Sequence, residues 1–188
     1  MNLPNKLSLL RIFLIPFVIF FYLADFIPYG KIIAIGIFII AALTDMLDGK
    51  IARKYNLVTN LGKLLDPIAD KLLVISSLLL VVVDGTIPAP YGIIVSVIII
   101  GRELLISAFR QIAASKNFVM AADNFGKLKT MVQDLAIPFL FLVSFLVADY
   151  SVSIAWSIVG WSLIGIATLL TLLSGINYIV KNREVLKD

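Results

Sequence analysis

The chain has 188 residues, of which 61% are hydrophobic and only 15% are charged, and its formal net charge is +4. A soluble domain carries about 25% charged residues, so this composition excludes an ordinary soluble protein and indicates a polytopic membrane protein. Cysteine and histidine are absent. Their absence excludes disulfides, thiolate catalysis and zinc–thiolate sites, and it leaves a carboxylate, a lysine or a tyrosine as the general base.

Six apolar segments are long enough to form membrane-spanning helices, because about 20 residues cross a bilayer. Turn-prone stretches separate them, and neither a long linker nor an internal repeat divides the chain. We therefore expect an all-α polytopic membrane protein with one integral-membrane domain over residues 1–188. The predicted spans are residues 7–24, 31–51, 63–84, 89–112, 128–148 and 152–178.

The distribution of lysine and arginine predicts the orientation of these spans. The basic residues are concentrated near both termini and in residues 50–63 and 110–129, whereas loops 25–31, 84–90 and 148–152 contain one lysine between them. By the positive-inside rule both termini face the cytoplasm, which requires an even number of spans and agrees with six. We expect a multi-pass protein of the cytoplasmic membrane.

Four aspartates lie near the cytoplasmic ends of the second and third predicted spans. Asp45 and Asp48 are three residues apart and Asp66 and Asp70 are four apart, so each pair shares one face of a helix. The apolar run before Asp45 rises about 18 Å at 1.5 Å per residue, into the inner part of a roughly 30 Å hydrocarbon layer. Carboxylates gathered there need cations to stay ionised, and oxygen ligands suit Mg²⁺ or Mn²⁺. The sequence thus predicts a polar cavity at the cytoplasmic side that holds two divalent cations.

The residues between the two aspartate pairs suit a diphosphate ligand. Gly49 and Gly62 leave the surface beside the carboxylates bare, and Arg53 can supply a fork of donors to phosphate oxygens. A structural cluster, a cation transporter and a proton relay are the alternatives. Intramembrane carboxylates are expensive for a purely structural role, and a transporter has no evident need of glycines and an arginine at these offsets.

The pattern D-x2-D-G-x2-A-R-x8-G-x3-D-x3-D runs from Asp45 to Asp70 and resembles the signature of the CDP-alcohol phosphatidyltransferases, with every fixed position present. The resemblance implies transfer of a phosphatidyl group from a CDP-linked lipid to an alcohol, with release of CMP. It also implies that Asp45, Asp48 and Asp66 bind two metals, and that Asp70 is both a metal ligand and the catalytic base.

The resemblance extends to polar residues expected beside the nucleotide. Family members carry a stretch similar to Asn5-x-x-Ser8-x-x-Arg11, and often a hydroxyl residue at the position of Thr59. An interfacial anchor or a helix cap is the alternative interpretation of the first three, and a backbone-bonding side chain is that of Thr44 and Thr59. The predicted nucleotide- and diphosphate-binding residues are Asn5, Ser8, Arg11, Thr44, Gly49, Ala52, Arg53, Thr59 and Gly62.

Cations near the fourth and fifth spans predict a site for a phosphate-bearing acceptor. Arg102 lies deep in its span beside Glu103, where an ordinary positive-inside anchor is not expected. An acceptor phosphate needs such a basic pocket next to the metals, although anchoring remains the alternative interpretation of the other cations. The predicted acceptor-phosphate-binding residues are Arg102, Arg110, Lys127 and Lys129.

Over essentially its full length the chain is also similar to the bacterial CDP-diacylglycerol–glycerol-3-phosphate 3-phosphatidyltransferases, on residues 2–11, 56–67, 101–103 and 126–130. This similarity implies CDP-diacylglycerol as donor, glycerol 3-phosphate as acceptor, and phosphatidylglycerol phosphate as product of a two-metal in-line displacement. Inositol phosphate, serine and inositol are the alternative acceptors. The family resemblance further implies a homodimer in the lipid bilayer, with no nucleic-acid partner.

Overall fold

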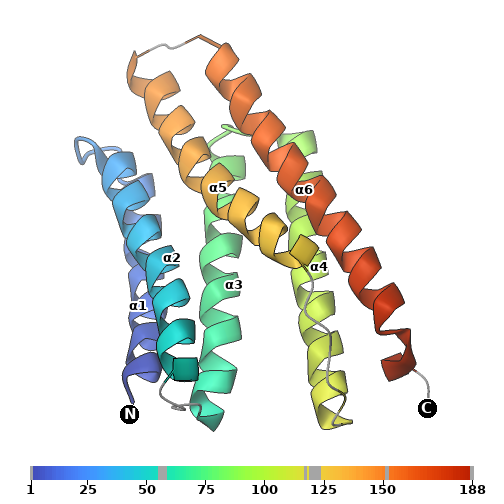
Figure 1. Ribbon diagram of the computed structural model, residues 1–188. Coiled ribbons are helices and arrows are strands. Elements are labelled where there is room, and N and C mark those ends of the chain that lie inside the picture. The colour runs from blue at the N-terminus through green and yellow to red at the C-terminus, as the bar shows by residue number, and fades with distance from the viewer. Residues whose placement is uncertain (1, 55–58, 117, 119–123, 151–152, 187–188) are drawn as a thin grey trace.

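The computed structural model describes residues 2–54, 59–116, 118, 124–150 and 153–186 (Figure 1). Within these ranges, the side chains of residues 46–54, 60–61, 63–64, 124, 149–150 and 186 lie outside the description. Every regular element in the described part of the chain is helical, which confirms the all-α prediction. The elements are α1 (Leu3–Leu23), α2 (Gly30–Lys54), α3 (Asn60–Val83), α4 (Ala89–Ser115), α5 (Asn124–Tyr150), α6 (Ala155–Lys181) and the short 3₁₀ helix η1 (Arg183–Leu186).

Two helices begin with side-chain caps that the sequence provides. The Asn2 side chain accepts a hydrogen bond from the Asn5 backbone N–H at the start of α1. At the start of α3, the Thr59 hydroxyl accepts one from the Gly62 N–H at 3.0 Å. Each cap satisfies a backbone donor that has no partner within the helix. The cap at Thr59 also fixes where α3 begins relative to Asp66.

The turn between α1 and α2 depends on a glycine. A Cβ atom at Gly30 would lie 2.5 Å from the carbonyl oxygen of Phe21, so any side chain there would force the two helices apart. Tyr29, just before it, has a φ of 61°, a left-handed conformation that a tight turn demands. This compact turn sets α1 and α2 side by side along one edge of the molecule (Figure 1).

The helices pack around one large apolar core. α1 packs on α2 and α3, α5 packs on α6 and α2, and α4 lies between α3 and α6. Val18, Phe38, Leu78 and Phe141 bring α1, α2, α3 and α5 together in this core. A smaller cluster, which includes Ile106 and Tyr178, joins α4 to α6 and is closed by Val185. The arrangement leaves the N-terminus, the C-terminal end of α2 and the start of α3 at the same end (Figure 1).

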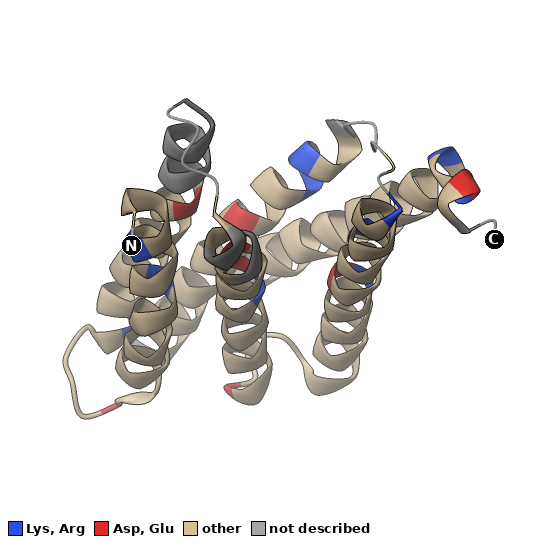
Figure 2. Ribbon diagram, turned by 90° about the horizontal axis from the view of Figure 1, so that it is seen from below, with Lys and Arg blue, Asp and Glu red and all other residues tan. Residues whose placement is uncertain are grey.

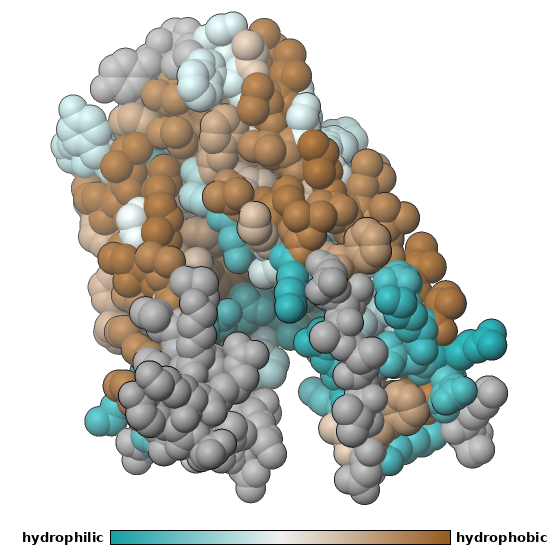
Figure 3. Space-filling view, viewed as in Figure 1, coloured by the Kyte–Doolittle hydropathy of each residue, from teal (hydrophilic) through white to brown (hydrophobic). Residues whose placement is uncertain are grey.

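Four helices, α1, α4, α5 and α6, are long and apolar enough to cross a membrane by length and composition, among the residues described. Many large apolar side chains on the outside of the bundle are exposed, as expected for a surface that faces lipid. In the space-filling view hydrophobic residues cover the upper part, while hydrophilic residues gather in a hollow between the lower ends of the helices (Figure 3). The protein is therefore a membrane-embedded helical bundle with a polar end.

The opposite end of the bundle is held by a part-buried polar network around Asp84, the residue that caps the C-terminal end of α3. Oδ2 of Asp84 accepts hydrogen bonds from the hydroxyls of Tyr22 and Ser144, both at 2.5 Å. Oδ1 accepts one from the Thr86 N–H at 2.9 Å. Lys31 lies 3.7 Å from the same carboxylate and donates to Ser144 at 2.6 Å. One carboxylate thus ties α1, α2, α3 and α5 together.

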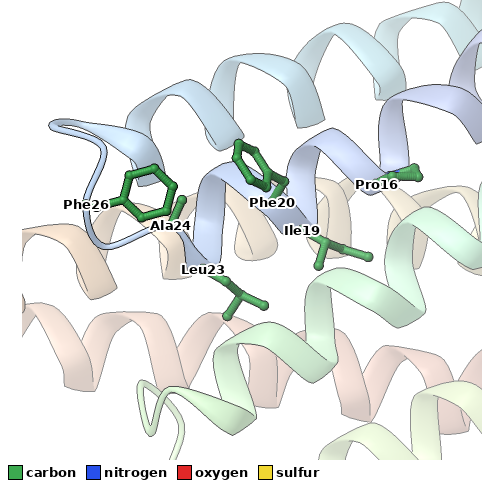
Figure 4. Close-up of a pocket in the computed structure, with 6 residues that line it drawn as sticks. All are labelled: Pro16, Ile19, Phe20, Leu23, Ala24 and Phe26. Carbon is green, nitrogen blue, oxygen red and sulfur yellow. The ribbon is translucent and has the colours of Figure 1, made fainter.

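An open apolar groove of about 490 Å³ runs along the second half of α1 and the turn that follows it (Figure 4). Among the described residues, no charged one lines it. The groove lies far along α1 from the aspartate-bearing helix ends, so it is not the candidate site. Its lining is Pro16, Ile19, Phe20, Leu23, Ala24 and Phe26.

Candidate active site

One polar face of α1 contacts both aspartate-bearing helices. Arg11, which is 0% exposed, places Nη1 2.7 Å from Oδ1 of Asp45 on α2, and its Nε donates to the Ala41 carbonyl at 3.2 Å. One turn earlier, the Ser8 hydroxyl contacts the carboxylate of Asp66 on α3. The helical spacing of the α1 residues, three positions apart, is what allows each of them to reach a different partner.

A further turn toward the N-terminus, Asn5 contacts the start of α3. Its Oδ1 accepts a hydrogen bond from the Thr59 hydroxyl at 2.9 Å. Gly62 makes this approach possible, because a Cβ atom there would lie 2.8 Å from Asn5 Oδ1 and 3.2 Å from Thr59 Oγ1. The space beside Gly62, which the sequence analysis assigned to the nucleotide, is filled by Asn5 in this structure. Thr44 donates to the Ala41 carbonyl at 2.6 Å, the backbone-bonding alternative considered for it.

Asp70 lies one turn beyond Asp66 and faces the other half of the bundle. It lines a polar cavity of about 20 Å³ between α3, α4 and α5. The carboxylate of Asp70 has no hydrogen bond or ion pair with any residue that the structure describes. The other lining residues are Lys71, Val74, Glu103, Lys129, Thr130, Gln133 and Asp134.

Glu103 organises the basic residues of this region. Its Oε1 lies 2.5 Å from Nζ of the buried Lys129 and 3.1 Å from Nη1 of Arg102. Nη2 of Arg102 donates to the Ser174 hydroxyl of α6 at 2.9 Å. The three charged groups sum to one net positive charge next to Asp70. The structure thus brings two of the four predicted acceptor-binding residues together.

The other two predicted acceptor-binding residues lie elsewhere. Arg110 donates from Nε to the Tyr178 hydroxyl at 3.1 Å, and its guanidinium group lies 5.3 Å from the centre of that ring. It therefore faces α6 rather than the cavity. Lys127 is exposed near the start of α5 and does not line the cavity.

The side chains of Asp48, Gly49, Ala52 and Arg53 lie outside the description, although their backbone belongs to α2. Among the described side chains, no three carboxylates converge closely enough to enclose a metal ion. The candidate metal-binding side chains that are described nevertheless suit a hard divalent cation. Their donor atoms are all oxygen, the Asp45 carboxylate is 47% exposed, and Asp45 lies near enough to Asp70 for their charges to interact.

Asp134 is a site residue that the sequence analysis missed. It lies on α5, lines the same cavity as Asp70, and interacts electrostatically with both Asp70 and Asp45. Seen from below, acidic segments of α2, α3 and α5 lie near one another between the helices (Figure 2). An ionisable residue within a predicted span was itself the signal that could have found it.

The protein is a helical membrane bundle whose first helix contacts aspartates at the ends of two neighbouring helices. This combination is typical of a membrane enzyme with an aspartate site at its helix ends. Residues 1–176 match the sequence profile of the CDP-alcohol phosphatidyltransferases, and the chain belongs to that family. It is a phosphatidyltransferase, as the aspartate signature predicted.

Individual relatives are similar over nearly the whole chain. The CDP-diacylglycerol–glycerol-3-phosphate 3-phosphatidyltransferase of Bacillus subtilis is 40% identical, with 99% of this chain and 97% of the relative covered. The enzyme of the same name from Rickettsia bellii is 37% identical, with 94% and 93% covered. That of Shigella flexneri is 36% identical, with 100% and 98% covered.

Proposed function

We propose that the protein transfers the phosphatidyl group of CDP-diacylglycerol to glycerol 3-phosphate, giving phosphatidylglycerol phosphate and CMP. The observation that carries this proposal is the similarity, over nearly the full length, to enzymes whose names state this reaction. The contacts that Ser8 and Arg11 make with Asp66 and Asp45 support it, because they orient two residues of the family signature.

We further propose that all six helices cross the cytoplasmic membrane as a single domain over residues 1–188. Four of them satisfy length and hydropathy among the described residues, and α2 and α3, with 25 and 24 residues, are also long enough to cross a bilayer. This topology places both termini and the aspartates at the cytoplasmic face, where the basic residues are concentrated. The acyl chains of the donor stay in the bilayer while its CDP head group enters between the lower ends of the helices. The resemblance to dimeric family members favours a homodimer.

Asp45, Asp48, Asp66 and Asp70 are the residues that would hold two divalent cations, Mg²⁺ or Mn²⁺. Such cations, when bound, neutralise the diphosphate and favour ionisation of the attacking hydroxyl. The α1 residues fix the orientation of Asp45 and Asp66. The residues proposed to bind the nucleotide and its diphosphate are Asn5, Ser8, Arg11, Thr44, Gly49, Ala52, Arg53, Thr59 and Gly62.

The chemical step requires one proton acceptor, and Asp70 is the residue proposed for it. Its carboxylate takes the proton of the acceptor hydroxyl as that oxygen attacks the lipid-side β-phosphorus in line. The phosphorus–oxygen bond to CMP breaks at the same time, and CMP leaves with the electron pair. The position of Asp70 on the cavity wall, without a hydrogen-bonding partner among the described residues, supports this role.

The acceptor phosphate is proposed to bind beside Arg102 and Lys129. Glu103 neutralises only one of these two cations, but Asp70 and Asp134 line the same cavity and are offset there only by Lys71, so a phosphate site here also depends on the proposed divalent cations. Arg110 and Lys127, like Arg102, are absent from the cavity lining, and their part in binding the acceptor phosphate stays a prediction.

The test is CMP release by the purified full-length protein in vesicles that contain CDP-diacylglycerol. Glycerol 3-phosphate, inositol phosphate, serine and inositol are supplied in turn, with Mg²⁺, with Mn²⁺ or with a chelator. CMP is expected with glycerol 3-phosphate and a divalent cation only. Release with another alcohol alone would overturn the acceptor. A cation flux across the vesicles without any CMP release would favour the transporter.

A further inference from the structure

The cavity beside Asp70 contains a buried amide oxygen that no group in the described part of the chain satisfies. Gln133 on α5 is 2% exposed, and its side-chain oxygen is buried with no hydrogen-bonding partner in the part of the chain that is described. Leaving such an atom unpaired is unfavourable, so a buried amide of this kind is expected to meet a ligand or a water. Gln133 lines the same cavity as Asp70.

The size of the cavity indicates what it can hold. A volume of about 20 Å³ has room for a single water or hydroxyl group, since one such group occupies about 10–15 Å³ by this measure. An acceptor can therefore place only one hydroxyl group inside the cavity, and the rest of the molecule must lie at its mouth. Two other lining residues with hydrogen-bonding groups already have partners. Lys129 is bonded to Glu103, and the Thr130 hydroxyl is bonded to the Gly126 carbonyl. The Gln133 amide is therefore the neutral group that is available to a hydroxyl.

The helical spacing of α5 connects this amide to the basic residues. Lys129 and Gln133 are four residues apart, so that they lie on one face with Cβ atoms about 5–6 Å apart. Glycerol 3-phosphate carries its phosphate and its middle hydroxyl on neighbouring carbons, and its terminal hydroxyl on the next. A molecule with its phosphate at Lys129 and its middle hydroxyl at Gln133 presents the terminal hydroxyl toward Asp70.

We infer that Gln133 is a specificity-determining residue that binds the middle, non-reacting hydroxyl of the acceptor and so selects a phosphorylated vicinal diol. This inference rests on the proposed function, because it takes glycerol 3-phosphate as the acceptor. The amide can serve the hydroxyl as acceptor or as donor, since its two ends exchange by a flip of the side chain. No bond is made or broken at Gln133.

The test compares glycerol 3-phosphate with 3-hydroxypropyl phosphate, which lacks only the middle hydroxyl. kcat/KM is measured for both with the wild-type protein and with Gln133→Met, which keeps the length of the side chain. The wild type is expected to prefer glycerol 3-phosphate by roughly tenfold or more, since the analogue leaves the amide unpaired. In Gln133→Met this preference should fall to about twofold or less, since neither substrate then has an amide to pair with.

Ser96→Ala is the matched control. The Ser96 hydroxyl is also buried without a partner among the described residues, but it lies earlier on α4 and does not line the cavity. Its removal should leave the preference unchanged. A preference that persists in Gln133→Met would show that the amide only binds water and would overturn the inference. Equal use of both substrates by the wild type would overturn it without any variant. If the wild type releases CMP with neither substrate, the proposed acceptor itself is wrong.

Discussion

Arg11 and Asp45 form an ion pair in which the arginine is completely buried and the aspartate is 47% exposed. The guanidinium group of the arginine also donates a hydrogen bond from Nε to the Ala41 carbonyl, within the packed interface of α1 and α2. The orientation of the carboxylate is therefore set from inside the protein, while its other side remains open. Such an arrangement suits a metal ligand, whose direction is normally fixed by a neighbouring group.

The first prediction concerns the geometry of this pair. Arg11→Lys keeps the charge but loses the planar fork that reaches Asp45 and Ala41 together, so kcat should fall roughly tenfold or more. The protein should still fold, because the buried position retains a cation next to Asp45. Steady-state CMP release and thermal unfolding in detergent measure the two effects. Full activity in Arg11→Lys would mean that the residue is an anchor only.

The contact between Ser8 and Asp66 gives a second prediction. Ser8→Ala removes the hydroxyl that orients the carboxylate, and the Mg²⁺ concentration for half-maximal rate should rise about 10- to 100-fold. Ser76→Ala is the control, since Ser76 donates only to carbonyls of its own helix, Leu72 at 2.7 Å and Leu73 at 3.1 Å. An unchanged Mg²⁺ requirement in Ser8→Ala would show that Asp66 is oriented by other contacts.

The third prediction tests the close approach of α1 to the start of α3. Gly62→Ala would press a Cβ atom against Asn5 and Thr59 and break the hydrogen bond between them. KM for CDP-diacylglycerol should rise roughly 3- to 10-fold, the effect of one such bond. Gly36→Ala is the control, because nothing lies within 4 Å of a Cβ atom there. Equal kinetics of the two variants would contradict a role for this contact.

The sequence predicts the helices well because the lengths of the apolar runs decide them, and it places Asn5, Ser8 and Arg11 on one face by spacing alone. It does not predict their partners. Which of the three meets Thr59, Asp66 or Asp45 depends on how α1 packs against α2 and α3. For the same reason the sequence does not predict that Arg110 contacts Tyr178, because the rotation of α4 against α6 depends on packing. Six spans and the metal ligands stay predictions.

The fourth prediction concerns the base. Asp70→Asn should lower turnover by at least about 100-fold, because the amide cannot accept the proton of the acceptor hydroxyl. Binding of CMP, measured by calorimetry in detergent, should change little. Asp25→Asn, in the exposed turn after α1, is the control and should behave as the wild type. Near-normal turnover of Asp70→Asn would exclude this aspartate as the base.

The last prediction separates stability from chemistry at the far end of the bundle. Asp84 accepts bonds from Tyr22, Ser144 and the Thr86 N–H, and it is the shared partner of helices that also carry the candidate site. Asp84→Asn should destabilise the protein by about 1–3 kcal/mol, since hydrogen bonds to a charged group are lost.

Tyr22→Phe, which removes one of these bonds, should cost about 1 kcal/mol. Thermal unfolding in detergent measures both variants. Asp84 caps the C-terminal end of α3, whereas Asp66 and Asp70 lie near the start of that helix. Because distant sites affect each other little, kcat/KM of the folded fraction should stay within about twofold of the wild-type value. A large fall in kcat/KM without a loss of stability would instead indicate that the network controls the geometry of the aspartates through α3.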